Sequence, residues 1–149
     1  SATDEALTDS PLAMCLQAEI YIRKDNLAEA HKVLDQVGQS LAVNGAVSHQ
    51  TRYRWAVAKL LAAENQFDEA LEIYRDITTL ASDKGLAWMR ARLEIDWANV
   101  LLQRAQPGDL VNAREKLIDA AAAFKQMGAN GYLEQVTAQL GLLENSAAH

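Results

Sequence analysis

The chain has 149 residues, a length that fits one domain, and its 20 acidic and 14 basic side chains give a net charge of −6. This charge argues against affinity that comes from neutralising phosphates, so we expect no direct contact of this segment with nucleic acid. No stretch approaches the ~20 apolar residues needed to span a bilayer, and the acidic start "SATDEALTDS" lacks the regions of a secretory signal, so we expect a cytoplasmic protein without membrane contact.

Helix-forming residues dominate the chain from end to end. Only two prolines and seven glycines interrupt abundant Ala, Leu, Glu and Gln, while β-branched residues are too scattered to indicate a sheet. We therefore predict an all-α fold. The predicted helices, in chain order, cover residues 10–23, 26–43, 48–64, 66–83, 86–105, 109–127 and 131–144.

The second, fourth and sixth of these helices begin with similar words. "NLAEAHKVL" at 26–34 aligns with "QFDEALEIY" at 66–74 and with "DLVNAREKL" at 109–117. Each word has an apolar residue, an alanine and a large residue at offsets of three, four and seven, which mark one face of a helix. The shared alanines predict close helix packing, and they are Ala30, Ala70 and Ala113.

The other helices carry an alanine of their own at a fixed position. Ala18, Ala58, Ala98 and Ala138 follow one another at intervals of forty residues. Small residues at fixed positions of two consecutive helices let their backbones approach, so the repeating unit is predicted to be a helical hairpin.

Residues that tend to end helices lie where such hairpins would end. Gly45, Gly85 and the stretch "MGANG" at 127–131 follow the second helix of each pair, as expected of glycine just past a helix end. The third hairpin has a longer internal link, "AQPGD", which indicates a Pro-Gly turn. Asp109 in this link is a suitable N-cap for the helix that follows.

Together these features predict one domain over residues 1–149, a right-handed solenoid of three antiparallel hairpins with a C-terminal capping helix. The repeats cover about 10–45, 46–85 and 86–130, and the capping helix covers about 131–144.

On these residues the sequence resembles the tetratricopeptide repeat (TPR) family over about residues 12–143. The paired alanines match the family's two small positions, Tyr21 and Tyr74 match its aromatic positions, and "FDEALEIY" is similar to its usual second helix. The period of forty departs from the family's thirty-four residues, and the proline that ends each unit is absent. The wording "AREKLIDAAAAFKQMGANGYLEQV" also resembles the repeat arms of large bacterial signal-transduction ATPases and transcription activators.

Few residues suggest chemistry of their own. His31, His49 and His149 have no metal-ligand spacing, and no glycine-rich phosphate loop follows a strand. Cys15 has no partner for an internal disulfide and is interpreted as a small buried hydrophobe, which suits a reducing compartment. We expect no catalytic residue, no metal site and no cofactor.

The resemblance places the inward side of the first helices at a set of positions that includes Leu12, Cys15, Glu19 and Ile95. Arg52 and Arg92 are one period apart and flank Trp55 and Ile95, a combination that would offer cations beside an apolar floor. Such a groove suits an extended peptide with an acidic group. The alternative is that the arginines only pair with neighbouring acids. The predicted partner-binding residues are Arg52, Trp55, Lys59, Arg92, Asn99 and Gln103.

The expected function is a non-catalytic scaffold or sensor module that binds a protein or peptide, as in signal transduction or transcription regulation. Two alternatives stay open: an arm of a larger bacterial regulator that self-associates into a homo-oligomer, and a domain that senses a small-molecule effector. Changing Trp55→Ala with Arg52→Glu is expected to abolish partner binding without changing the melting temperature. The aromatic residues interpreted as core are Tyr21, Phe67, Tyr74, Trp97 and Phe124. For Trp88 and Tyr132, packing between repeats and partial exposure are equally consistent.

Overall fold

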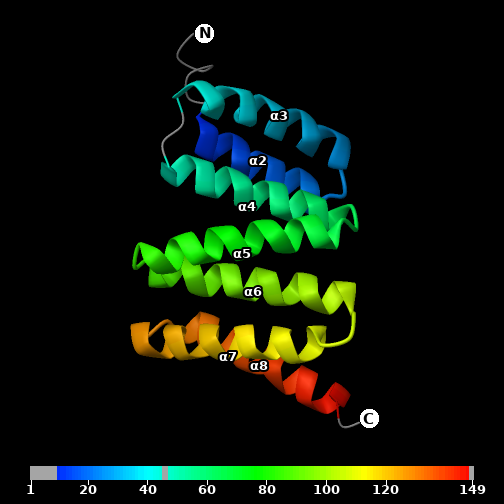
Figure 1. Cartoon of the computed structure of the whole chain (residues 1–149), viewed down its shortest axis with the longest axis vertical. Coiled ribbons are helices and arrows are strands. Elements are labelled where there is room, and N and C mark those ends of the chain that lie inside the picture. Colours follow the sequence, from blue (N-terminus) through cyan, green and yellow to red (C-terminus); the bar gives the residue numbers. More distant parts are fainter. Residues whose placement is uncertain (1–9, 45–46, 148–149) are drawn as a thin grey trace. The chain divides into compact units, whose positions relative to one another are not determined.

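A computed structural model describes residues 10–44 and 47–147, and within them the chain is all helical, as predicted. The helix boundaries agree with the predicted ones to within a few residues (Figure 1). The seven helices of the described chain are α2 (Pro11–Arg23), α3 (Leu27–Asn44), α4 (Val47–Ala63), α5 (Phe67–Asp83), α6 (Ala87–Arg104), α7 (Asp109–Met127) and α8 (Asn130–Ala147).

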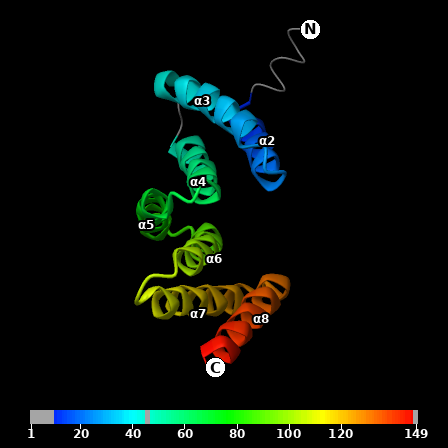
Figure 2. The same cartoon turned by 90° about the vertical axis from the view of Figure 1, so that its right-hand side faces the viewer.

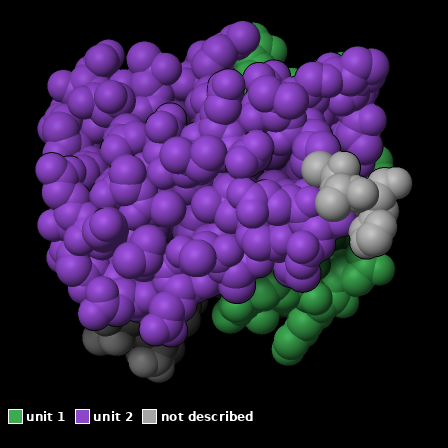
Figure 3. All heavy atoms as spheres, turned by 90° about the horizontal axis from the view of Figure 1, so that it is seen from below, with its two compact units in different colours: residues 1–73 green, residues 74–149 purple. Residues whose placement is uncertain are grey.

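The chain forms two compact units, residues 1–73 and 74–149, which Figure 3 draws in different colours. The boundary falls inside α5, so this helix contributes its first turns to one unit and its remainder to the other. Each unit is described by itself below. The single domain over residues 1–149 stays a prediction.

In the first unit, α2 packs against both α3 and α4, and α3 also packs against α4. The predicted small residues lie at this seam: Ala18 of α2 and Ala30 of α3 are completely buried. Larger apolar side chains fill the core around them, with Leu34 and Val37 from α3 and Leu60 from α4. Burial of this apolar surface is the main term that holds the three helices together.

One close approach in this core depends on a glycine. A Cβ atom placed on Gly38 of α3 would lie 2.6 Å from Oη of Tyr53, which reaches over from α4. The absence of a side chain at Gly38 is therefore what admits the tyrosine.

In the second unit, α6 packs against α7, and α7 packs against α8 (Figure 2). Ala98 and Ala113 are completely buried, as the alanine pattern predicts. Phe124 is also fully buried and stacks on Tyr132 of α8, at a ring-centroid distance of 5.1 Å. Trp88 meets both rings edge-on, yet part of its indole stays exposed.

The fourth alanine of the predicted series behaves differently from the first three. Ala18, Ala58 and Ala98 are completely buried, whereas Ala138 on α8 is exposed. The three buried alanines lie in α2, α4 and α6, and the helix that follows each of these in the chain has a buried alanine of its own. In the described chain α8 is the last helix, and no such second helix follows it.

Residues in left-handed conformation follow several of the helices, and Ala105 after α6, with a φ of 55°, is one of them. Gly85 and Gly128 have φ values of 69° and 72°, as predicted for glycine past a helix end, while Gly45 lies outside the described residues. The short links inside the first two predicted hairpins use Asp25 and Asn65 instead, with φ values of 59° and 63°. These two residues are forty apart, so the repeat extends to the backbone of its turns.

The Pro-Gly link before α7 is held by Asp109. The predicted N-cap role of Asp109 is wrong, because α7 already begins at this residue and Gly108 occupies the cap. The carboxylate instead accepts two hydrogen bonds from Arg104, from Nε at 2.9 Å and Nη2 at 2.7 Å, and one from the backbone N–H of Gln106 at 2.9 Å. The side-chain hydrogen bond from Arg104 is the main reason that the pKa of Asp109 is lowered.

Candidate functional site

The forty-residue period places one polar side chain at the same position of every first helix. Counting from the buried alanine, the next residue is Glu19 in α2, Lys59 in α4, Asn99 in α6 and Gln139 in α8. In the first unit, Nζ of Lys59 donates to Oε1 of Glu19 at 2.6 Å. In the second unit, Nε2 of Gln139 donates to Oδ1 of Asn99 at 2.6 Å. Each pair therefore forms a rung that joins two first helices of the same unit.

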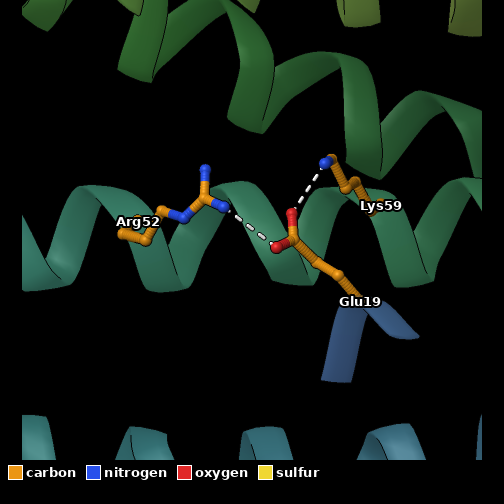
Figure 4. A network of polar contacts seen from close by, with 3 residues as sticks. All are labelled: Glu19, Arg52 and Lys59. Atoms are coloured by element: carbon orange, nitrogen blue, oxygen red, sulfur yellow. Dashed lines mark hydrogen bonds and ion pairs between the residues drawn. The ribbon is translucent and has the colours of Figure 1, made fainter. Parts of the chain in front are cut away.

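The rung of the first unit is part of a larger charge cluster. Nη2 of Arg52, one turn or so before Trp55 on α4, donates to the second carboxylate oxygen of Glu19 at 2.9 Å. Figure 4 shows the Glu19 carboxylate between the two cations, each oxygen facing one of them. We call these three residues, Glu19, Arg52 and Lys59, the Glu19 cluster.

Exposure is unequal within the Glu19 cluster. The Glu19 side chain retains 10 % of its accessible surface, while Arg52 retains 19 % and Lys59 retains 30 %. Solvent therefore meets mainly the cationic side of the cluster, in a protein whose net charge is −6.

Trp55 provides the apolar support of the two cations. Cζ of Arg52 lies 4.9 Å from the indole centroid, and Nζ of Lys59 lies 5.3 Å from it, both within the range of cation–π attraction. Trp55 itself is only 2 % exposed. The accessible surface here consequently belongs to Arg52 and Lys59. The indole of Trp55 is covered, so the prediction that it forms part of an open apolar floor is wrong.

The Glu19 carboxylate is largely removed from water, so its charge requires compensation within the protein. Burying a carboxylate costs several kcal/mol unless paired charges and hydrogen bonds compensate. Glu19 receives two charge-assisted hydrogen bonds, one on each oxygen, which is the arrangement that compensates best. The two cations thus offset the desolvation cost of the Glu19 carboxylate, and in doing so their own side chains are held in place.

The remaining predicted binding residues lie in the second unit. The guanidinium carbon of Arg92 lies 5.9 Å from the ring centroid of Tyr132, which is forty residues further on. Asn99 is half-buried in its rung, whereas Gln103 is exposed at the end of α6. The structure thus brings Arg52, Trp55 and Lys59 together and joins Arg92 and Asn99 to α8, while the partner-binding role of all six stays a prediction.

Three residues of this arrangement were not among the predicted binding residues: Glu19, Tyr132 and Gln139. A signal for them was present, since each lies forty residues from a predicted one. Opposite charges at Glu19 and Lys59 could have indicated a pair at equivalent positions of neighbouring repeats. Arg52 does pair with a neighbouring acid, Glu19, as the alternative interpretation of the arginines allowed.

Two buried groups outside the set of predicted binding residues have raised pKa values. Burial raises the pKa of the Cys15 thiol to about 11, so this thiol is a poor nucleophile at neutral pH. Burial also raises the pKa of Glu94, with Asp119 adding to the effect and Arg90 and Lys116 opposing it. One oxygen of Glu94, Oε2, is buried and has no hydrogen-bond partner.

Metal coordination finds no support in the described part of the chain, where no three His, Cys, Asp or Glu side chains gather around a common point. His31 instead lies 2.9 Å from Oε2 of Glu64. Among the described helices, none has the length and apolar character required to cross a membrane.

Comparisons with known proteins add no identity. No protein-family model matches the chain, and neither the curated proteins nor the solved structures contain a significant match. The likeness to TPR proteins therefore stays a hypothesis that rests on the residues quoted above.

Proposed function

We propose that the protein is a non-catalytic TPR-like scaffold whose first helices bind an acidic segment of a protein partner. In this proposal the helices form antiparallel hairpins stacked as a right-handed solenoid, and the first helices line its inner side. The observation that carries the proposal is the Glu19 cluster, in which two partly exposed cations are held in place by a carboxylate that is almost out of reach of solvent.

Fixed cations favour binding for a physical reason. A free surface arginine or lysine loses conformational entropy when a ligand immobilises it. Arg52 and Lys59 have lost much of this freedom already, through Glu19 on one side and the Trp55 ring on the other. An acidic group of a partner would then meet a positive spot on an otherwise acidic protein, which also aids selection of the partner.

The test compares two peptides of equal length, one rich in glutamate and one with glutamine in its place, each labelled with fluorescein. Fluorescence anisotropy should show tighter binding of the glutamate peptide, and the difference should shrink as salt is added. Arg52→Gln is expected to weaken this binding about tenfold, the loss of roughly 1.4 kcal/mol. Lys32→Gln serves as the matched control, because Lys32 is a largely exposed cation on α3 that pairs with Glu29.

Equal binding of the two peptides, or equal loss in the Arg52 and Lys32 variants, would contradict the proposal. Trp55→Ala is unsuitable for this test. Since the indole is buried, its removal is expected to lower the free energy of unfolding by about 3–5 kcal/mol and to mix folding with binding.

A further inference from the structure

Aromatic side chains of the second unit gather where α6 begins, α7 ends and α8 begins. The ring centroid of Trp88 lies 5.0 Å from that of Tyr132 and 5.6 Å from that of Phe124, and the indole plane is nearly perpendicular to both rings. Phe124 is fully buried, whereas Trp88 is 44 % exposed and Tyr132 is half-buried. We call Trp88 and Tyr132 the aromatic pair.

The two rings of the aromatic pair are supported by their neighbours. Tyr132 stacks on Phe124, and the guanidinium carbon of Arg92 lies 5.9 Å from the Tyr132 ring centroid. Trp88 in turn contacts both stacked rings. Rings held in this way lose little conformational freedom when a ligand covers them. Exposed tryptophan and tyrosine side chains are also the kind that contribute most to binding at protein interfaces.

Each ring of the aromatic pair also carries a hydrogen-bond donor, the indole Nε1–H of Trp88 and the phenol Oη–H of Tyr132. Within residues 10–44 and 47–147, neither donor has an acceptor from the protein. The Tyr132 oxygen is not buried, so a ligand can reach it. The aromatic pair therefore suits a ligand that combines apolar surface with hydrogen-bond acceptors.

A proline-rich segment has this combination of properties. Proline lacks an N–H group, and the polyproline II conformation has no internal hydrogen bonds, so its carbonyl groups are open acceptors. Its rings dock on exposed aromatic side chains, and the conformation is formed before binding. A helix fits less well, because it uses its carbonyl groups internally. A second copy of the chain also fits less well, since its two prolines, Pro11 and Pro107, are far apart.

From the packing of these rings and their two donors we infer that the aromatic pair binds a proline-rich segment of a partner protein in the polyproline II conformation. The aromatic pair belongs to the second unit and the Glu19 cluster to the first, so the inference does not depend on the proposed acidic ligand. Binding of a proline segment needs no charge on the ligand. It should therefore be insensitive to salt, unlike binding of the acidic segment.

Nuclear magnetic resonance of the full chain, labelled with nitrogen-15, tests the inference. The probe is a peptide of ten prolines, and a glycine-serine peptide of equal length is its control. Decaproline should shift the indole N–H signal of Trp88, which a Trp88→Phe spectrum identifies, at low and high salt alike. The signal of the buried Trp55 should stay in place. An unmoved Trp88 signal, or equal shifts with the two peptides, overturns the inference.

A variant that keeps all the rings tests the role of the donors. Tyr132→Phe removes only the hydroxyl group, so it should weaken decaproline binding about three- to tenfold without loss of folding. Leu142→Ala is the matched control, because it changes an exposed side chain of the same helix and should leave the affinity unchanged. Arg52→Gln should also leave it unchanged, which separates this site from the Glu19 cluster. Equal affinities of the Tyr132 and Leu142 variants for decaproline, or tighter binding of an amphipathic helical peptide at Trp88, would contradict the assignment.

Discussion

Lys59 Nζ lies 2.6 Å from Glu19 Oε1, and the two residues are forty positions apart in the sequence, at the same place in consecutive first helices. Asn99 and Gln139 repeat the arrangement with amides. The polar contacts between first helices thus follow the period of the alanine pattern, with a charged rung in one unit and a neutral rung in the other.

The charged rung predicts that the effects of substitutions at Glu19 and Lys59 on the free energy of unfolding are not additive. Glu19→Gln should lower the free energy of unfolding by about 1–3 kcal/mol, because it removes the carboxylate that pairs both cations. Lys59→Gln should cost less, since Arg52 remains to pair Glu19. Urea unfolding of the double variant should show a smaller loss than the sum of the singles, because Gln at both positions imitates the neutral rung. Strict additivity would contradict an energetic coupling of the two residues.

The contact between Gly38 and Tyr53 predicts that the effect of Gly38→Ala on stability is opposite to the usual effect of this substitution in a helix. Alanine in place of a glycine inside a helix ordinarily stabilises by about 1 kcal/mol. Here the new Cβ would lie 2.6 Å from Tyr53 Oη, so Gly38→Ala should destabilise the protein by about 1–3 kcal/mol. In a Tyr53→Phe background the obstructing oxygen is gone, and the same substitution should be neutral or stabilising. Thermal or urea unfolding of the four proteins measures this, and a similar loss in both backgrounds would contradict the steric explanation.

Glu94 predicts a stability that falls as the pH rises. Its pKa is raised by burial, so the folded state binds the proton more tightly than the unfolded state. The stability that it contributes is complete below the ordinary glutamate pKa of about 4.3 and is lost as the pH rises through the folded value. Glu94→Gln removes the buried charge but keeps an oxygen that can accept from Arg90, so it should stabilise the protein at neutral pH by about 1 kcal/mol. This advantage should shrink on acidification.

Urea unfolding of both proteins at several pH values measures the Glu94 effect. Glu115→Gln, at an exposed position of α7, is the control and should change little at any pH. A constant difference between the wild type and Glu94→Gln would show that the Glu94 carboxyl titrates alike in both states.

Asp109 predicts a pH dependence of stability opposite to that of Glu94, with stability that falls as the pH is lowered. Hydrogen bonds from Arg104 lower its pKa, so the folded state favours the ionised form. That stability is present above the ordinary aspartate pKa of about 3.9 and is lost as the pH falls through the folded value. Asp109→Asn should cost about 1–2 kcal/mol at neutral pH through weaker hydrogen bonds, and the cost should vanish in acid. Asp83→Asn, at an exposed position near the end of α5, should show neither effect in the same unfolding series.

The architecture within each unit was largely predictable from the sequence, because alanine spacing and helix period report directly on packing. Ala18, Ala30, Ala98 and Ala113 are all completely buried, and Phe124 is core as predicted. The spacing could not reveal that Ala138 would be exposed, since burial of an alanine requires a following helix as well as the right position.

The candidate site was less predictable. Arg52, Trp55 and Lys59 do come together, as their positions on one helix imply. The depth of Trp55 was missed because a position that faces a ligand in a family pattern can still be covered by the long side chains beside it. Glu19 is the centre of the cluster although its partners lie 33 and 40 residues away, and among the sequence patterns only the forty-residue period connects it with one of them, Lys59.

The rungs also limit how such a chain can evolve. A duplication that placed a helix of one rung against a helix of the other would pair unlike side chains, so a lysine could face an asparagine, or a glutamate a glutamine. The buried alanines would still pack in the new position, but the polar side chains of the rung would no longer be complementary. Glu19 and Lys59 are therefore expected to change together in evolution, and so are Asn99 and Gln139.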